Sequence, residues 1–123
     1  MRCRGRARGE RGAATAELAL GLPLLLGLTV GLVWLLAAGA AQVRVVDGAR
    51  EVARAVARGD AEASAVARGV EVAGDGSLVS VARGSGEVRV TVTRQFDGPG
   101  GLLEGLPAVE LRAVAVAASE EPG

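Results

Sequence analysis

Hydrophobic and polar positions follow three consecutive patterns along this chain. From Leu18 to Val43 no residue carries a charge, and roughly 20 apolar residues suffice for a helix to cross the hydrocarbon core of a bilayer. Between residues 44 and 58 charged residues recur at steps of three and four among Val and Ala, which is the period of an amphipathic helix. After Gly69 apolar and polar positions alternate, which is the period of a β-strand.

The first two patterns predict one long helix over residues 13–58. Its transmembrane part covers about residues 18–43, and its amphipathic half, residues 44–58, lies outside the membrane. Pro23 lies inside the helix, removes one backbone hydrogen bond and predicts a kink.

Capping residues set the expected ends of the helical segments. Thr15 is a candidate N-cap for the long helix, and Gly59 is a candidate stop. Asp60 is then expected to cap a short helix that ends near Arg68.

The alternating pattern predicts a small antiparallel β-meander of three to four strands, with only the helix to pack on. This gives an α+β fold, in which residues 60–118 form the short helix and a β-rich extracytoplasmic region. Residues 119–123 are expected to be a disordered tail. The candidate strands are residues 70–72, 78–81, 87–94 and 109–117.

The charge distribution is asymmetric although the formal net charge is zero. Residues 1–12 contain five arginines and one glutamate, whereas residues 44–123 contain nine arginines and 12 acids. This asymmetry follows the positive-inside rule and predicts a single-pass cell-membrane protein with a cytoplasmic N-terminus and an extracytoplasmic C-terminal region. An arginine-rich nucleic-acid arm is the alternative, but a bilayer-length apolar run follows it directly, so we expect no nucleic-acid partner.

The residues needed for most catalytic and metal sites are missing. Histidine is absent and Cys3 is the only cysteine, so the usual zinc ligands and general bases are lacking. The acids Asp97, Glu104 and Glu110 have no partner base, and no Lys follows the glycine-rich segments, which are therefore turns rather than phosphate loops. We expect no enzyme activity, no cofactor, no metal and no small-molecule substrate.

The segment Arg11-Gly12-Ala13-Ala14-Thr15-Ala16-Glu17 resembles the cleavage region of type IV prepilins, in particular TadE-like minor pilins of tight-adherence (Flp-type) pili. The stretch from Glu17 to Pro23 and the mixed-charge stretch 43–54 are similar to the same family. In this family a membrane peptidase cuts after a glycine that follows a short basic leader, and a glutamate occupies the fifth position of the mature chain. The resemblance implies that residues 1–12 are a basic prepilin-type leader, that cleavage separates Gly12 from Ala13, and that Glu17 is the fifth mature residue.

Glu17 also has a physical interest of its own. A carboxylate in a bilayer-length helix is costly to bury unless it is paired. Cleavage after Gly12 would free an α-amine on Ala13, and this amine could neutralise Glu17 of a neighbouring subunit in a packed bundle. A simple alternative is that Glu17 is a first-turn acid favoured by the helix dipole. The residues alone leave both interpretations open.

Gly27 and Gly31 form a Gly-x-x-x-Gly pair on one face of the predicted helix. Small residues at this spacing let a second helix backbone approach closely. The chain has 19 glycines, so the pair could also arise by chance, and both interpretations stay open.

The resemblance implies a minor pilin or pseudopilin of a tight-adherence pilus or a related secretion apparatus. Its partners would be the membrane, a prepilin peptidase, other pilin-like subunits and the pilus assembly machinery. One alternative is an uncleaved single-pass scaffold of a secretion complex that keeps Met1. Another is a small secreted β-domain released after Ala40, but the apolar run is longer than the 7–15 residues typical of a signal peptide.

Overall fold

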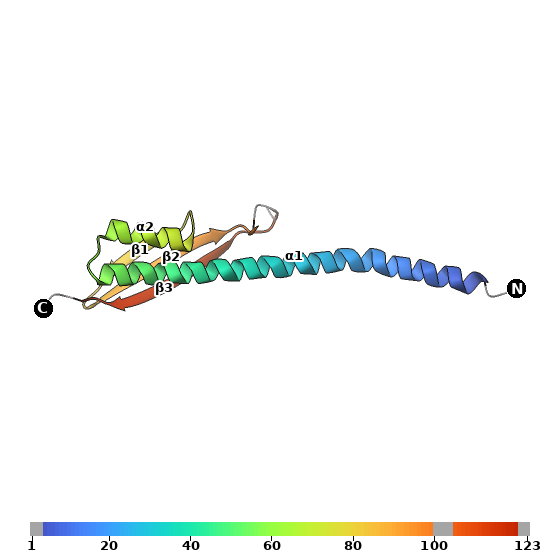
Figure 1. Cartoon of the computed structure of the whole chain (residues 1–123), viewed down its shortest axis with the longest axis horizontal. Coiled ribbons are helices and arrows are strands. Elements are labelled where there is room, and N and C mark those ends of the chain that lie inside the picture. Colours follow the sequence, from blue (N-terminus) through green and yellow to red (C-terminus); the bar gives the residue numbers. More distant parts are fainter. Residues whose placement is uncertain (1–3, 100–104, 121–123) are drawn as a thin grey trace. The chain divides into compact units, whose positions relative to one another are not determined.

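A computed structural model describes residues 4–99 and 105–120, with side chains described from Gly9 onward. The chain divides into two compact units, residues 1–35 and 36–123, and the boundary falls inside the first helix. The expected α+β fold is confirmed, because a long apolar N-terminal helix is followed by a three-stranded antiparallel sheet. The elements in chain order are α1 (Arg4–Ala57), α2 (Glu62–Ala73), β1 (Leu78–Arg83), β2 (Glu87–Phe96) and β3 (Val109–Ala118) (Figure 1).

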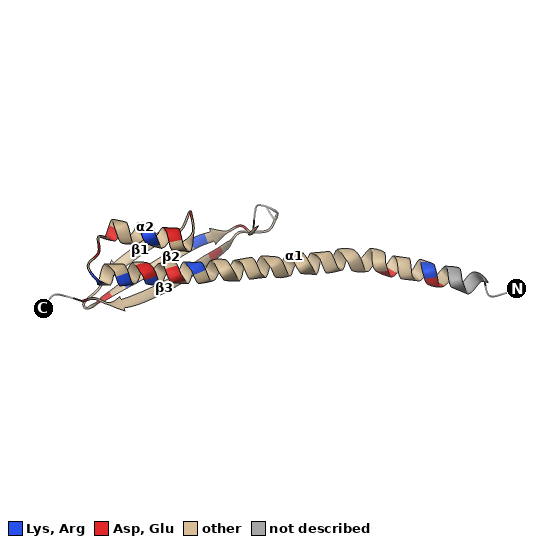
Figure 2. Cartoon of the chain, viewed as in Figure 1, with Lys and Arg blue, Asp and Glu red and all other residues tan. Residues whose placement is uncertain are grey.

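The first unit is the N-terminal part of α1. Its large apolar side chains are exposed; Leu20, for example, is 76% exposed and Leu24 75%. Charged residues are absent from this stretch after Glu17 (Figure 2). A helix that is hydrophobic all round is typical of a membrane span, and the helix over Gly9–Ala57 is long and apolar enough to cross a membrane by length and composition.

The start of α1 differs from the expectation. The helix begins at Arg4 rather than at Ala13, since Arg, Ala and Glu are good helix formers and no proline precedes Pro23. Thr15 is therefore not an N-cap: its Oγ1 donates a hydrogen bond to the carbonyl of Arg11 at 2.9 Å within the helix.

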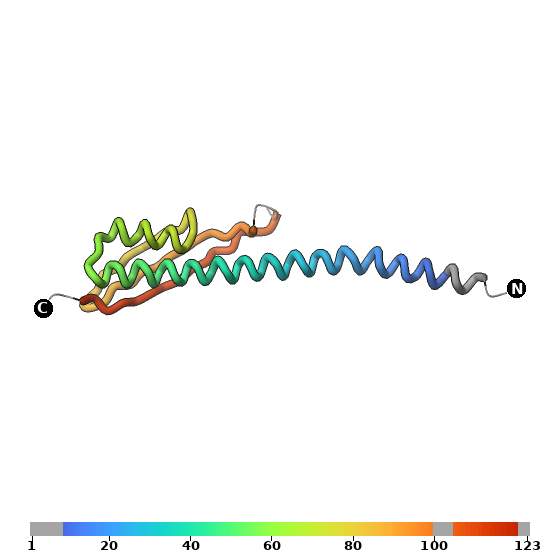
Figure 3. The backbone as a smooth tube through the Cα atoms, in the orientation of Figure 1, coloured from blue at the N-terminus to red at the C-terminus, as the bar shows by residue number. Residues whose placement is uncertain are grey.

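In the second unit the three strands form a meander of order β1-β2-β3, with both pairs antiparallel (Figure 3). Gly86 adopts a φ of 81° in the turn between β1 and β2, a conformation that favours glycine. The Gly84 N–H closes this hairpin on the Glu87 carbonyl at 2.9 Å. The expected alternation is clear in β2, where Val88, Val90 and Val92 are fully buried.

The core lies between the inner face of this sheet and the C-terminal part of α1. Val45 and Val52 of α1 are completely buried, and so are the small residues Ala49 and Ala55. Val and Ala provide almost all of this core. The opposite face of the sheet has no covering element among the described residues, and Val114 and Val116 are about half exposed there.

The second helix corrects two expectations. It continues through Gly69 to Ala73, so it does not end near Arg68, and residues 70–72 are helical rather than a strand. Gly69 lies inside this helix, at the point where α1 approaches α2 closely. A Cβ atom at residue 69 would clash with Cγ2 of Val52. Across the contact, a Cβ atom on Gly48 would lie 2.8 Å from the Gly69 carbonyl oxygen.

Two arginines hold the C-terminal end of α2. Arg44 Nε donates to the Val72 carbonyl at 3.2 Å, and Arg94 Nη1 donates to the Ala73 carbonyl at 2.9 Å. Cations are favourable at this end of a helix, where carbonyl groups lack helical partners. The two bonds therefore connect α2 to both α1 and β2.

The turn between the helices forms as expected at Gly59, whose φ is 91°, but Asp60 does not cap α2. The N-cap residue is Ala61, without a side-chain capping bond. Asp60 instead accepts a hydrogen bond from Arg68 at 2.6 Å and faces Arg58 at 3.7 Å. The hydrogen bond from Arg68 is the main cause that holds the pKa of Asp60 below its ordinary value of 3.8. These pairs therefore favour the folded state above that pH, and their contribution disappears as the pH falls through the lowered pKa.

The C-terminal expectation is wrong for two residues. The Ser119 N–H donates to the Gly86 carbonyl at 3.0 Å, and the Glu120 N–H donates to the Ala57 carbonyl at 3.3 Å. Residues 121–123 and Glu104 lie outside the described residues. Strand β2 extends two residues beyond the predicted range 87–94 and ends at Phe96, which is buried.

Candidate assembly site

The predicted cleavage site lies in the N-terminal unit. Gly12 and Ala13 are both exposed and helical, and apart from the local helix backbone no atom lies within 4 Å of the position that a Cβ on Gly12 would take. A protease must draw its substrate out of a helix, and Gly9 and Gly12 each weaken a helix by roughly 1 kcal/mol relative to alanine. Both glycines therefore lower the local stability of the helix beside the predicted cleavage site.

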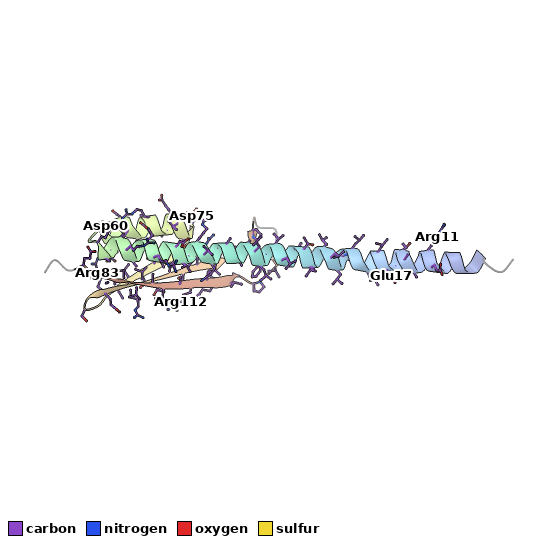
Figure 4. The ribbon with its side chains drawn as sticks, turned by 60° about the horizontal axis from the view of Figure 1, so that its bottom comes forward. Arg11, Glu17, Asp60, Asp75, Arg83 and Arg112 are labelled. Carbon is purple, nitrogen blue, oxygen red and sulfur yellow. The ribbon has the colours of Figure 1, made fainter. Side chains whose placement is uncertain are left out.

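Glu17 is an exposed carboxylate among exposed leucines. In the part of the chain that the structure describes, it forms no ion pair, and Arg11 projects from a different side of the helix (Figure 4). A charge in these apolar surroundings gains a partner only from another molecule, since lipid offers none to compensate it.

The glycine pair lies on the same half of the helix as Glu17. At 3.6 residues per turn, Gly31 is about 40° and Gly27 about 80° around the axis from Glu17, in the same sense. Neither glycine has an atom within 4 Å of the position that a Cβ would take. One side of this unit thus combines an unpaired acid with a surface that admits a close backbone.

Pro23 lies inside α1. Because proline has no N–H, the carbonyl of Ala19 lacks its helical donor. The predicted kink at this residue stays a prediction.

Comparison with known families identifies a similarity for part of the N-terminal helix. The family model described as TadE-like protein matches residues 12–54. Residues 12–54 are TadE-like. The match confirms the resemblance drawn from the sequence, and it contains every residue of the candidate site. No match was found among curated proteins or among solved structures.

The match relates residues 12–54 to TadE-like proteins. The match ends within α1, so α2 and the sheet lie outside the matched residues. Among the described residues no group of three or more His, Cys, Asp and Glu side chains could hold a metal ion. In the sheet, Glu110 lies opposite Gln95 and not opposite a base.

Sequence reasoning missed one contact of the TadE-like segment with the sheet. Gln42, the last polar residue of the apolar run, donates from Nε2 to the carbonyl of Arg112 at 3.0 Å. An uncharged amide at the end of a membrane-length run is a weak signal of a contact with the sheet, because such an amide could equally well be exposed to the lipid headgroups. The partner in β3 is 70 residues away and no local pattern indicates it.

Proposed function

We propose that this chain is a minor pilin-type subunit of a tight-adherence pilus or of a related secretion apparatus. Its role is assembly rather than catalysis. The observation that carries the proposal is Glu17, an acid without a partner in the described residues, which is the fifth residue after Gly12 in a TadE-like helix.

The first step follows from the charge asymmetry of the chain. The arginine-rich leader stays in the cytoplasm and the region after Arg44 lies outside. A prepilin peptidase then cuts between Gly12 and Ala13. The cut removes five of the 14 arginines and leaves a new α-amine four residues before Glu17.

The second step is lateral packing of the mature helix. The α-amine of one subunit and Glu17 of its neighbour form an ion pair in apolar surroundings, where a lone charge would be costly. The Gly27 and Gly31 surface, on the same half of the helix, lets the neighbouring helix approach closely.

The test is the intact mass of the native protein extracted from membranes, beside a Gly12→Leu variant designed to resist cleavage. A native chain that begins at Ala13, beside a variant that keeps Met1, supports the proposal. A native chain that begins at Met1 identifies the uncleaved scaffold instead. A soluble chain that begins at Ala41 identifies the secreted β-domain.

A further inference from the structure

The hydrogen-bonding pattern of the sheet determines which backbone groups point out of its two edges. In an antiparallel pair, residues alternate between those that bond the neighbouring strand and those that point away from it. The Gly84 N–H bonds the Glu87 carbonyl and the Ser119 N–H bonds the Gly86 carbonyl, which fixes the phase of both ladders. It follows from the register that Val79 and Val81 point out of the β1 edge, and that Val114 and Val116 point out of the β3 edge.

These outward groups are available. Among the described residues, no hydrogen bond involves the outward N–H or C=O groups of these four valines. On β3 the free edge begins after Arg112, whose carbonyl is occupied by Gln42. Neither strand contains Pro, and their charged residues, Arg83, Glu110 and Arg112, lie outside the segments 79–81 and 114–116; charges and proline are the usual protection of an edge against pairing with another chain.

Membrane anchoring limits how two copies can meet, and this step rests on the proposed function. The second unit starts with the last apolar turns of the span, Leu36 to Val43, so every copy in one bilayer or one pilus has the same polarity. Strands from two such copies can pair only in parallel. Antiparallel pairing of β3 with β3 would invert one copy.

Parallel pairing of like edges fails when the two copies stand at equal height. In a parallel ladder, one of two opposite residues points towards the partner strand and the other points away. A two-fold axis along the strands would place Val114 opposite Val114, with both residues pointing towards each other. Pairing of β3 with β1 meets the requirement, because Val114 points outward and Ser80, at the same height in the register, points towards its own β2.

We propose that β3 of one copy adds in parallel to β1 of a second copy and extends the sheet from subunit to subunit. The Val114 N–H donates to the Val79 carbonyl of the second copy, and the Val81 N–H of that copy donates to the Val114 carbonyl. The contact uses two different edges, so it repeats from copy to copy instead of closing a symmetric dimer.

The side chains at this junction have complementary sizes. At equal height the inner face of β3 presents Ala113 and Ala115, and that of β1 presents the larger Val79 and Val81. All four are half-buried in the single chain, so the junction buries them further. On the outer face, the half-exposed Val114 meets Ser80 of the next copy.

Cysteine cross-linking in membranes tests the junction. Two full-length chains, each with Cys3→Ser, carry Ser80→Cys on one and Val114→Cys on the other, with different tags. Adjacent strands lie about 4.8 Å apart, within disulfide range, whereas the two positions within one chain are about twice as far apart because β2 lies between them. Oxidation should give mixed dimers that disappear on reduction, and a chain with both cysteines should give a ladder of multimers.

The matched control replaces Ser80→Cys by Arg89→Cys, an exposed outer-face position on the central strand, which should not cross-link to Val114→Cys. The proposal would be overturned if the mixed dimers were no more abundant than in this control. It would also be overturned if Val114→Cys chains cross-linked with one another as well as they cross-link with Ser80→Cys chains. If the mature chain begins at Ala13 and the mixed pair still fails, only the junction is wrong. If the chain keeps Met1, the proposed function fails irrespective of the cross-links.

A backbone variant gives a second readout. Val81→Pro removes the outward N–H that the junction needs and leaves the ladder to β2 intact, since proline is tolerated on an edge strand. In the chain with both cysteines it should abolish the multimer ladder, whereas Val81→Ala should keep it. Circular dichroism verifies that both variants fold. A ladder that persists in folded Val81→Pro protein would contradict the proposal.

Discussion

At the scale of single residues, Glu17 is a carboxylate for which the described part of the chain provides no ion-pair partner. The carboxylate lies among exposed leucines and has no ion-pair partner in the described structure. The sequence predicts the position of this acid at the start of an apolar helix, because that position depends only on the spacing from Gly12 and on the apolar run that follows. The arginines that hold the end of α2 could not be predicted, since Arg94 reaches Ala73 across 21 residues.

Replacing Glu17 by Ala should leave membrane insertion intact and lower incorporation into pili or the assembly complex at least about tenfold. An apolar-site ion pair worth more than about 1.4 kcal/mol would account for this factor. The measurement is the amount of the protein in sheared pili or in the purified complex, relative to the membrane fraction. Glu10→Ala is the matched control, because cleavage would remove residue 10. Equal incorporation of the Glu17 and Glu10 variants would rule out the proposed role of Glu17.

At the scale of elements, prediction succeeded where the local period is long and failed where it is short. The alternating residues of β2 and the amphipathic half of α1 form what their patterns predict. Two valines at residues 70 and 72 are too few to distinguish a strand from a helix. Residue 69 must be a glycine because it contacts Val52 and Gly48 of α1. No local sequence pattern indicates this contact.

Gly69→Ala should lower the free energy of unfolding of the second unit by about 1–3 kcal/mol, because the added methyl group forces α1 and α2 apart. Thermal unfolding of the full chain in detergent, followed by circular dichroism, measures the change. Gly39→Ala serves as control, since nothing lies within 4 Å of that position. Adding Val52→Ala to Gly69→Ala should recover part of the loss. Equal stabilities for the Gly69 and Gly39 variants would show that the helices are not in close contact.

At the scale of the whole molecule, the sequence indicates the two-part organisation, because composition changes from uncharged to mixed-charge along the chain. The meander order of the strands also follows from turn signals, whereas the number of strands is predicted only as three to four. What could not be predicted is which backbone groups point out of the sheet edges. That property depends on the phase of the ladders, which Ser119 and Gly86 help to set over a long sequence separation.

The orientation in the membrane gives a prediction for the whole chain. A Ser85→Cys variant, combined with Cys3→Ser, should react with a membrane-impermeant maleimide on intact cells with an accessible outer membrane face, because residue 85 is exposed in the turn after β1. The reference is native Cys3 in the Gly12→Leu variant, which should react only after the cells are permeabilised. Labelling of Cys3 alone in intact cells would establish the opposite orientation.

The apolar side chains that surround α1 from Leu18 to Leu36 have one more consequence. Contact of all of them with water would cost tens of kcal/mol, at roughly 1.5–3 kcal/mol for each large side chain. Any transfer of this helix from lipid into a fibre therefore cannot pass through an aqueous intermediate. Each turn must exchange acyl chains for a protein neighbour as it leaves the bilayer, so the growing end of such a fibre has to stand within the membrane itself.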